Sequence, residues 1–222
     1  MTRRILLCLF AVIAAASAMA QIPAEVKDVL KKCEDKMASY NTPAGFMVDA
    51  NMKMKVSVFS LSGPIKMYTK GNKYFTTVSM NAMKKEMMKI EVGFDGTQKW
   101  EYVSTSDDDR NDSLKITRTQ GSKNALGMKI DYDKDYRKAK MKVSGRYYEI
   151  TFSGPLRKEI SKKATVKIDK ESYLMREYSV NEDVAGFSAQ VTITINKLTR
   201  GCPDNWLKLD MNRYKNAVVV RR

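Results

Sequence analysis

The segment FMVDANMKMKVSV, residues 46–58, decides the fold class of this chain. Every second residue in it is apolar, and the positions between them are mostly Asp, Asn, Lys and Ser. Successive side chains of a β-strand point to opposite faces, so a period of two is typical of a strand with one buried and one solvated face. We therefore predict a long amphipathic strand here, ended by the turn residues Ser62-Gly63-Pro64.

The same alternation recurs, in shorter form, along the rest of the chain. Asp95-Gly96 separates two alternating segments and is a strong signal for a tight β-hairpin. The segment 104–137 breaks the pattern with a polar, acidic loop and a turn-rich stretch. Short connections without helices favour one antiparallel sheet. With the first strand, the predicted strands number about ten, the others being 65–67, 74–80, 88–94, 100–102, 139–143, 148–152, 164–168, 174–180 and 187–195.

A helix is predicted before the first strand. Residues 26, 29, 30, 33 and 37 are apolar and form one stripe at the helical period, and Pro23 suits the helix start. One helix is too small to cover the apolar face of such a sheet, so we expect the sheet to curl around an apolar cavity. The predicted fold class is mainly β with α: a single curled antiparallel sheet, or unclosed β-barrel, with an N-terminal helix.

Residues 1–20 are predicted to be a signal peptide. Arg3 and Arg4 precede a short apolar run, and Ala18-Met19-Ala20 supplies the small residues that a signal peptidase reads. We expect residues 21–222 to form a single domain that is exported to the periplasm. Two cysteines, Cys33 and Cys202, then remain, and in an oxidising compartment such a pair is expected to form a disulfide. Two buried free thiols are the alternative.

The composition disfavours most enzyme classes. The chain has no histidine, which excludes Ser-His-Asp and Cys-His nucleophile systems and His-ligated zinc. The acidic loop at Asp107, Asp108 and Asp109 lacks the spacing of a calcium loop. No Gly-rich phosphate loop is present, and no carboxylate pair stands out as a glycosidase dyad. We therefore expect no enzymatic activity, no catalytic residue, no metal and no cofactor, and a carboxylate hydrolase is the least favoured class.

Charge and methionine content point to the class of ligand. The formal net charge is +15, with lysines spread along the polar strand faces. For an exported protein a lipid headgroup or membrane surface is favoured over nucleic acid as the anionic partner, although solvated lysines protecting strand edges explain most of them. The 15 methionines include several on apolar strand faces, where they either line an adaptable binding surface or fill an ordinary core. The predicted cavity lining is Phe46, Val48, Met52, Met54, Met67, Met88, Ile90, Val92, Trp100, Met141 and Ile150.

Several segments together resemble the lipoprotein localisation factor A (LolA) family. The hairpin FDGTQKWEY, residues 94–102, is similar to the DGxxxWxY hairpin of that family and is the most specific of them. The others are YYEITF at 147–152, ATVKID at 164–169, GF at 186–187, INKL at 195–198, WLKLD at 206–210 and AVVV at 217–220. The resemblance covers nearly all of residues 21–222. It implies an unclosed β-barrel with short lid elements over a hydrophobic cavity, and periplasmic escort of acylated lipoproteins toward the outer membrane.

Two functions are therefore carried forward from the sequence. The first is a periplasmic carrier that binds the acyl chains of lipoproteins or other lipids, works as a monomer, and exchanges its ligand with transfer proteins of the inner and outer membranes. The second is a protein-binding or sensing module of the same fold with a filled core.

Overall fold

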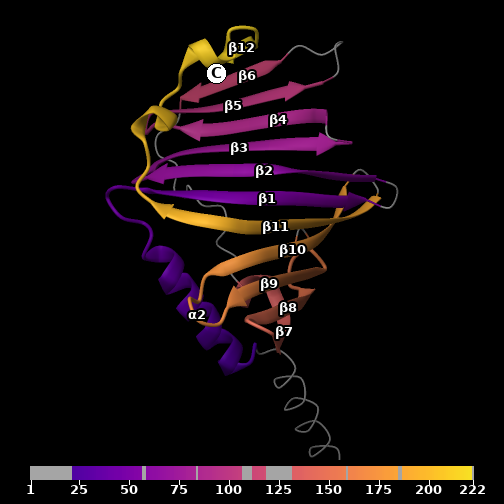
Figure 1. Ribbon diagram of the computed structural model, residues 1–222. Helices are drawn as coiled ribbons and strands as arrows, with labels where there is room; N and C mark the ends of the chain where they lie inside the picture. The colour runs from indigo at the N-terminus through magenta and orange to yellow at the C-terminus, as the bar shows by residue number, and fades with distance from the viewer. Residues whose placement is uncertain are drawn as a thin grey trace, which may run out of the picture.

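The chain folds around one continuous β-sheet (Figure 1). The computed structural model describes residues 22–56, 59–83, 85–106, 112–118, 132–158, 160–184 and 187–221. Within them lies a 12-stranded sheet in the order β12-β6-β5-β4-β3-β2-β1-β11-β10-β9-β8-β7. Neighbouring strands are antiparallel except β12, which is parallel to β6. The sheet is unclosed and curls, so that β7–β10 turn away from the plane of β1–β6 (Figure 1).

Most consecutive strands are joined by short connections, whereas longer segments separate β6 from β7 and β11 from β12. The first six are β1 (Phe46–Val56), β2 (Phe59–Lys70), β3 (Lys73–Ala82), β4 (Lys85–Phe94), β5 (Gln98–Thr105) and β6 (Ser113–Arg118). The others are β7 (Tyr136–Ser144), β8 (Tyr147–Pro155), β9 (Lys163–Asp169), β10 (Met175–Val184), β11 (Phe187–Arg200) and β12 (Val218–Arg221). The chain reaches β11 last among the long strands and pairs it with β1, which joins the two halves of the sheet.

The predicted helix is confirmed as α2 (Ala24–Ala38), with Pro23 at its N-cap. Its buried residues are Val26, Val29, Leu30 and Cys33, four of the five positions of the predicted stripe. Shorter helices are α3 (Tyr132–Asp135) and the 3-10 turns η1 (Asp204–Leu207) and η2 (Met211–Tyr214). No helix among the described residues is both long enough and apolar enough to span a bilayer.

The two faces of the sheet carry separate apolar cores. We call the face that packs on α2 the helix face; it includes Phe46, Val48 and Ala50 of β1 together with Ile150 of β8 and Val166 of β9. The opposite face carries a second cluster made of Tyr68, Phe75, Trp100, Leu114 and Ile116. Leu207 and Tyr214, from the segment that contains η1 and η2, cover this second cluster. The sheet is therefore covered on parts of both faces.

The strand content differs from the sequence prediction in two places. The structure has 12 strands rather than about ten, because β6 lies within the segment 104–137 and β12 follows η2. In β6 only Leu114 and Ile116 alternate, within a segment that is otherwise polar, and four-residue β12 is parallel to a distant partner. The lid elements expected from the family resemblance fall mostly on residues 107–111 and 119–131, which lie outside the described residues.

The predicted turn at Ser62-Gly63-Pro64 is also wrong. These residues lie inside β2, where Gly63 pairs with Met52 and Pro64 with Asn51 of β1. A Cβ atom on Gly63 would lie 1.9 Å from the carbonyl oxygen of Ser79 in β3, so only glycine allows the two backbones to approach. The Gly-Pro pair therefore marks a close strand approach rather than a chain reversal.

The hairpin predicted at Asp95-Gly96 is confirmed between β4 and β5. The Asp95 carboxylate accepts hydrogen bonds from the backbone N–H groups of Thr97 and Gln98, each at 2.9 Å. These bonds hold the pKa of Asp95 below its usual range even though partial burial of the carboxyl opposes them. Gly96 has a φ of 103°, a backbone conformation that glycine adopts without strain.

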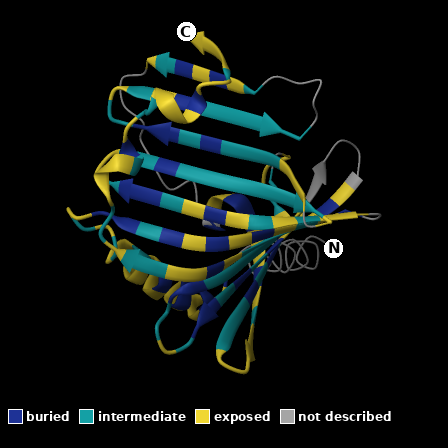
Figure 2. Cartoon of the chain, turned by 45° about the horizontal axis from the view of Figure 1, so that its top comes forward, coloured by how far each residue is buried: buried dark blue, intermediate teal, exposed yellow. Residues whose placement is uncertain are grey.

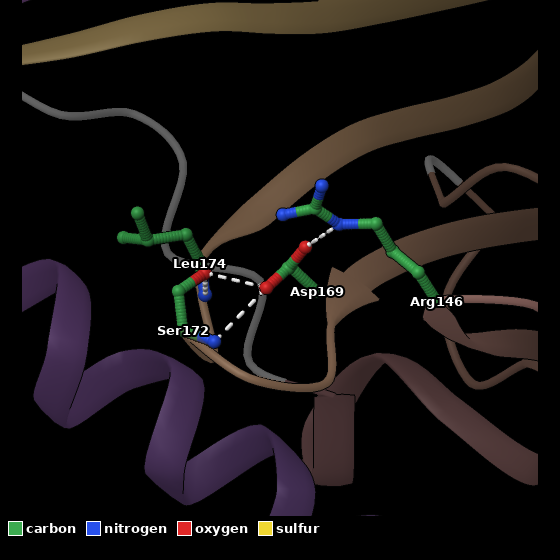
Figure 3. A network of polar contacts seen from close by, with 4 residues as sticks. All are labelled: Arg146, Asp169, Ser172 and Leu174. Atoms are coloured by element: carbon green, nitrogen blue, oxygen red, sulfur yellow. Dashed lines mark hydrogen bonds and ion pairs between the residues drawn. The ribbon is translucent and has the colours of Figure 1, made fainter.

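A buried carboxylate joins two turns at the curled end of the sheet (Figure 3). Asp169 is fully buried, and it accepts hydrogen bonds from the backbone N–H of Ser172 at 2.9 Å and from its hydroxyl at 2.8 Å. Arg146, in the turn between β7 and β8, donates its Nε–H to the same carboxylate. Asp169 therefore ties the β7–β8 turn to the β9–β10 turn.

The expected disulfide is absent, and both cysteines are free thiols. Cys33 lies on α2 within the helix-face core, whereas Cys202 packs against the cluster on the opposite face. The sheet separates the two side chains, which sequence distance alone does not reveal. Burial raises the pKa of the Cys33 thiol to about 11, so this residue stays in the unreactive protonated form.

Candidate functional site

The helix face is densely packed at the end of the sheet where α2 lies. Ile150, Phe152, Val166 and Ile168 of β8 and β9 are fully buried there. The ring of Phe152 stacks on that of Tyr132, with centroids 4.5 Å apart. Burial raises the pKa of the Tyr132 hydroxyl well above its usual range, as expected for a phenol surrounded by apolar side chains. This region, from β7 to β11 with α2, has the character of an ordinary protein core.

The same face changes character on β2–β5. Residues that pair across neighbouring strands lie on the same face of the sheet. Val48 of β1 lies on the helix face and pairs with Met67 of β2. Met67 pairs with Thr76 of β3 and Thr76 with Val92 of β4, so these residues also lie on the helix face. Most apolar side chains there are half-buried, although Ile65 and Phe94 are buried, and Figure 2 shows β3 and β5 as largely intermediate in exposure. We call this region the half-buried surface; it consists of Met67, Val78, Met80, Met88, Ile90, Val92 and Val103.

The half-buried surface is continuous with the core on one side. Met67, Val78 and Met80 pack against the helix-face core, whereas Met88, Ile90, Val92 and Val103 belong to neither of the two clusters of the described chain. Two methionines face each other across the strands, since Met80 pairs with Met88. Thioether side chains are flexible and polarizable, so they adapt to ligands of variable shape. Such a surface holds apolar groups by contact and desolvation rather than by directional bonds.

Charged residues border the half-buried surface on its far side. On β5, the positions in register with Phe94 and Val92 are Lys99 and Glu101, and on β6 Lys115 lies opposite Glu101. Lys99 and Lys115 are exposed. The helix face thus runs from a dry core through half-buried apolar residues to a charged border. This order matches an amphiphile whose apolar tail and polar end need different surroundings.

The structure places ten of the eleven predicted lining residues on the helix face. Phe46, Val48, Met52 and Ile150 are buried in its core, and Met67 and Met141 pack against that core. Met54, Met88, Ile90 and Val92 are half-buried outside it. Their role in binding a ligand stays a prediction.

Trp100 does not share the helix face. It pairs with Gly93 of β4 and lies in the cluster on the opposite face, where only 1% of it is exposed. A Cβ atom on Gly93 would lie 2.0 Å from the indole ring, so the ring lies directly over the glycine. Trp100 pairs with Gly93, and not with Val92 of the predicted lining. This register of β5 against β4 puts Trp100 on the face that the η1–η2 segment covers.

Three residues of the half-buried surface are absent from the predicted lining: Val78, Met80 and Val103. The signal for two of them was present, because Tyr74, Thr76, Val78 and Met80 alternate along β3. Only the cross-strand register shows that these positions share a face with Val48 and Met67. Val103 follows from its pairing with Ile90.

Buried Glu91 forms a hydrogen bond and an ion pair with neighbouring side chains. On the opposite face, the Tyr214 hydroxyl donates a 2.9 Å hydrogen bond to Glu91, which also pairs with Lys89 at 2.7 Å. Burial and the neighbouring Glu91 carboxylate raise the pKa of the Tyr214 hydroxyl. Within the described part of the chain, no group of three or more Cys, Asp or Glu side chains is placed to hold a metal ion.

Comparison with known proteins gives structural likeness without sequence likeness. No family model matches the chain. No curated protein matches it in sequence. An uncharacterized conserved protein from Thermus thermophilus is similar in structure, with a TM-score of 0.49 and 10% identity over 89% of this chain and 99% of that one.

Two further solved structures are also similar in fold. The lipoprotein LppX of Mycobacterium tuberculosis has a TM-score of 0.47 and 14% identity, over 79% of this chain and 96% of that one. A LolA superfamily protein from Nitrosomonas europaea has a TM-score of 0.35 and 10% identity, over 83% and 97%. The solved structures to which this chain is similar in fold thus include a LolA superfamily protein.

Proposed function

We propose that this protein is a non-enzymatic periplasmic carrier that binds the acyl chains of lipoproteins or other lipids. The observation that carries the proposal is the half-buried surface on β2–β5, which is apolar and rich in methionine beside a core that is already filled by α2. Each methylene removed from water contributes about 0.8 kcal/mol, so a long acyl chain gains enough to bind without directional contacts.

The charged border on β5 and β6 gives the proposed ligand its orientation. The acyl chain lies along Val78, Ile90 and Val92, and the polar end of the lipid lies toward Lys99 and Lys115. Transfer proteins in the inner and outer membranes would load and unload such a ligand, and a net charge of +15 favours approach to an anionic bilayer.

Native mass spectrometry of protein purified from its own cell envelope tests the proposal. We expect the chain to carry a bound lipid or acyl group. A fluorescent palmitoyl probe supplies the quantitative test. Val78→Gln, on the half-buried surface, is expected to weaken probe binding by about tenfold, because a polar amide replaces an apolar contact. Thr77→Gln is the matched control, because the neighbouring residue on β3 points to the opposite face.

The same experiment separates the carrier from a protein-binding or sensing module. A chain that is purified without lipid and gives no saturable probe binding supports the module. Equal losses in Val78→Gln and Thr77→Gln would also count against the carrier, because they would place the probe away from the helix face.

A further inference from the structure

The last described strand is an edge with an unusual composition for an edge. Among the described residues, β12 pairs only with β6 and has no strand on its other side. Its three valines, Val218, Val219 and Val220, are 53%, 39% and 44% exposed. Successive side chains alternate between faces, so β12 carries valines on both faces, a pattern typical of strands inside a sheet. A free edge of this kind is a template for adding another strand.

A pocket lies beside this edge on the opposite face. Its volume is about 480 Å³, and it is lined by Gln98, Ile116, Arg118, Leu209, Met211 and Arg221. Arg221 comes from β12 itself and pairs with Ile116 of β6. The pocket therefore opens next to the strand whose outer edge has no partner in the described chain.

The pocket carries positive charge from two arginines, and this favours an anionic ligand. Neither the Arg118 nor the Arg221 side chain has an ion-pair or hydrogen-bond partner among the described residues, and both residues are exposed. The six lining residues include two guanidinium groups and no acid, and three of them are apolar. Guanidinium groups bind carboxylates through paired, charge-assisted hydrogen bonds. The pocket is thus complementary to a carboxylate carried by a partly apolar segment.

We propose that β12 and this pocket bind an extended acidic peptide segment of a partner protein. The main chain of the segment adds a strand to the outer edge of β12, and an Asp or Glu side chain enters the pocket between Arg118 and Arg221. Main-chain hydrogen bonds then supply affinity, and the pocket supplies specificity. The formal charge of +15 opposes a second copy of this chain as the occupant and favours an acidic partner. The site is separate from the half-buried surface, which lies on the other face.

Selection from a displayed library of random eight-residue peptides tests this site. The purified chain is the bait, and the double variant Arg118→Glu/Arg221→Glu is used for counter-selection. We expect the enriched peptides to contain an Asp or Glu among alternating β-branched residues. Their affinity should fall by about tenfold or more in the double variant, because two charge-assisted contacts become repulsive. Arg137→Glu, at an exposed arginine on β7, is the matched control and should bind normally.

Amide hydrogen exchange of the complex locates the added strand. We expect exchange at Val218–Arg221 to slow when the selected peptide binds. The proposal is overturned when no peptide is enriched, when the double variant binds the peptides as well as the parent chain, or when protection appears only elsewhere. Sedimentation that reports a dimer, dispersed by Val219→Glu, would also overturn it, since a second copy would then occupy the edge. Lipid binding by the helix face is measured separately, so its failure leaves this test unaffected.

Discussion

The two ends of the helix face are built from the same kind of strand but reach different degrees of burial. On β8 and β9, Ile150, Phe152 and Val166 are fully buried, because α2 fills the curl of the sheet there. On β3 and β4, Val78, Ile90 and Val92 have the same chemistry and remain half-buried. An apolar strand face is thus a core only where another element covers it. The filled end therefore supports the fold, whereas the half-buried surface keeps apolar side chains partly in water, and the proposed ligand site rests on this difference.

The largest expected loss of stability comes from a substitution in the core between α2 and β8–β9. Phe152→Ala should lower the free energy of unfolding by about 3–5 kcal/mol, because it removes a buried ring and leaves a cavity beneath Tyr132 and Tyr136. Urea denaturation followed by tryptophan fluorescence measures the change. A loss below about 1 kcal/mol would mean that this end is loosely packed, and the contrast between the two ends would collapse.

The buried carboxylate at the same end should give the next largest effect. Asp169→Asn removes a buried charge that Arg146 and Ser172 satisfy, and we expect it to destabilise the fold by about 2–3 kcal/mol at neutral pH. Ser172→Ala is the milder companion, because the backbone N–H of residue 172 still donates to the carboxylate.

The pH dependence of the same variant gives an independent check. The hydrogen bonds from Arg146 and Ser172 hold the folded-state pKa of Asp169 well below the ordinary value of 3.8. A depressed pKa stabilises the folded state fully above 3.8, and this contribution is lost as the pH falls toward the folded-state pKa. The stabilities of the parent chain and Asp169→Asn should therefore converge below pH 3.8. A constant difference from neutral pH into that acid range would contradict this linkage.

A third substitution tests the opposite face, where the cover comes from the η1–η2 segment. Gly93→Ala places a methyl group where the indole ring of Trp100 lies, and we expect a loss of about 1–3 kcal/mol from the strain of repacking. Thermal unfolding measures it. A gain in stability would mean that the Trp100 ring moves off the glycine at no cost, and Trp100 would not be fixed on that face.

The smallest expected effect on stability falls on the half-buried surface. Ile90→Ala should cost about 1 kcal/mol or less, because the isoleucine is already partly in water. Urea denaturation under the conditions used for Phe152→Ala makes the two losses comparable. A loss as large as that of Phe152→Ala would show that β4 belongs to the core and would remove the surface proposed for the acyl chain.

Local signals in the sequence were sufficient to predict the elements that depend on neighbouring residues. The stripe from Val26 to Met37 predicted α2, and Asp95-Gly96 predicted the β4–β5 hairpin, because capping and turn geometry depend on residues that are close in the chain. Signals that depend on distant partners are misleading. Gly63-Pro64 predicts a turn, and the close approach of β3 that explains Gly63 is visible only in the sheet.

The sequence also predicts only part of the half-buried surface, because it shows alternation along each strand but not the register between strands. Alternation placed Met54, Met88, Ile90 and Val92 on one side of their strands, and the structure keeps all four on the helix face. Alternation does not say how one strand aligns with the next, so the predicted lining includes Trp100, which lies on the opposite face, and lacks Val78. The expected disulfide failed likewise, because nothing in the spacing of Cys33 and Cys202 reveals a sheet between them.

The sequence alone determined that this chain is an amphipathic sheet preceded by one amphipathic helix, since period and turn chemistry are properties of neighbouring residues. Only the tertiary structure decided which apolar faces are covered. Packing of α2 buries one end of the helix face, and the η1–η2 segment buries the cluster around Trp100 on the other side. Burial depends on contacts between residues far apart in the chain, and these contacts leave β2–β5 as the half-buried surface and β12 as an edge without a partner in the described chain.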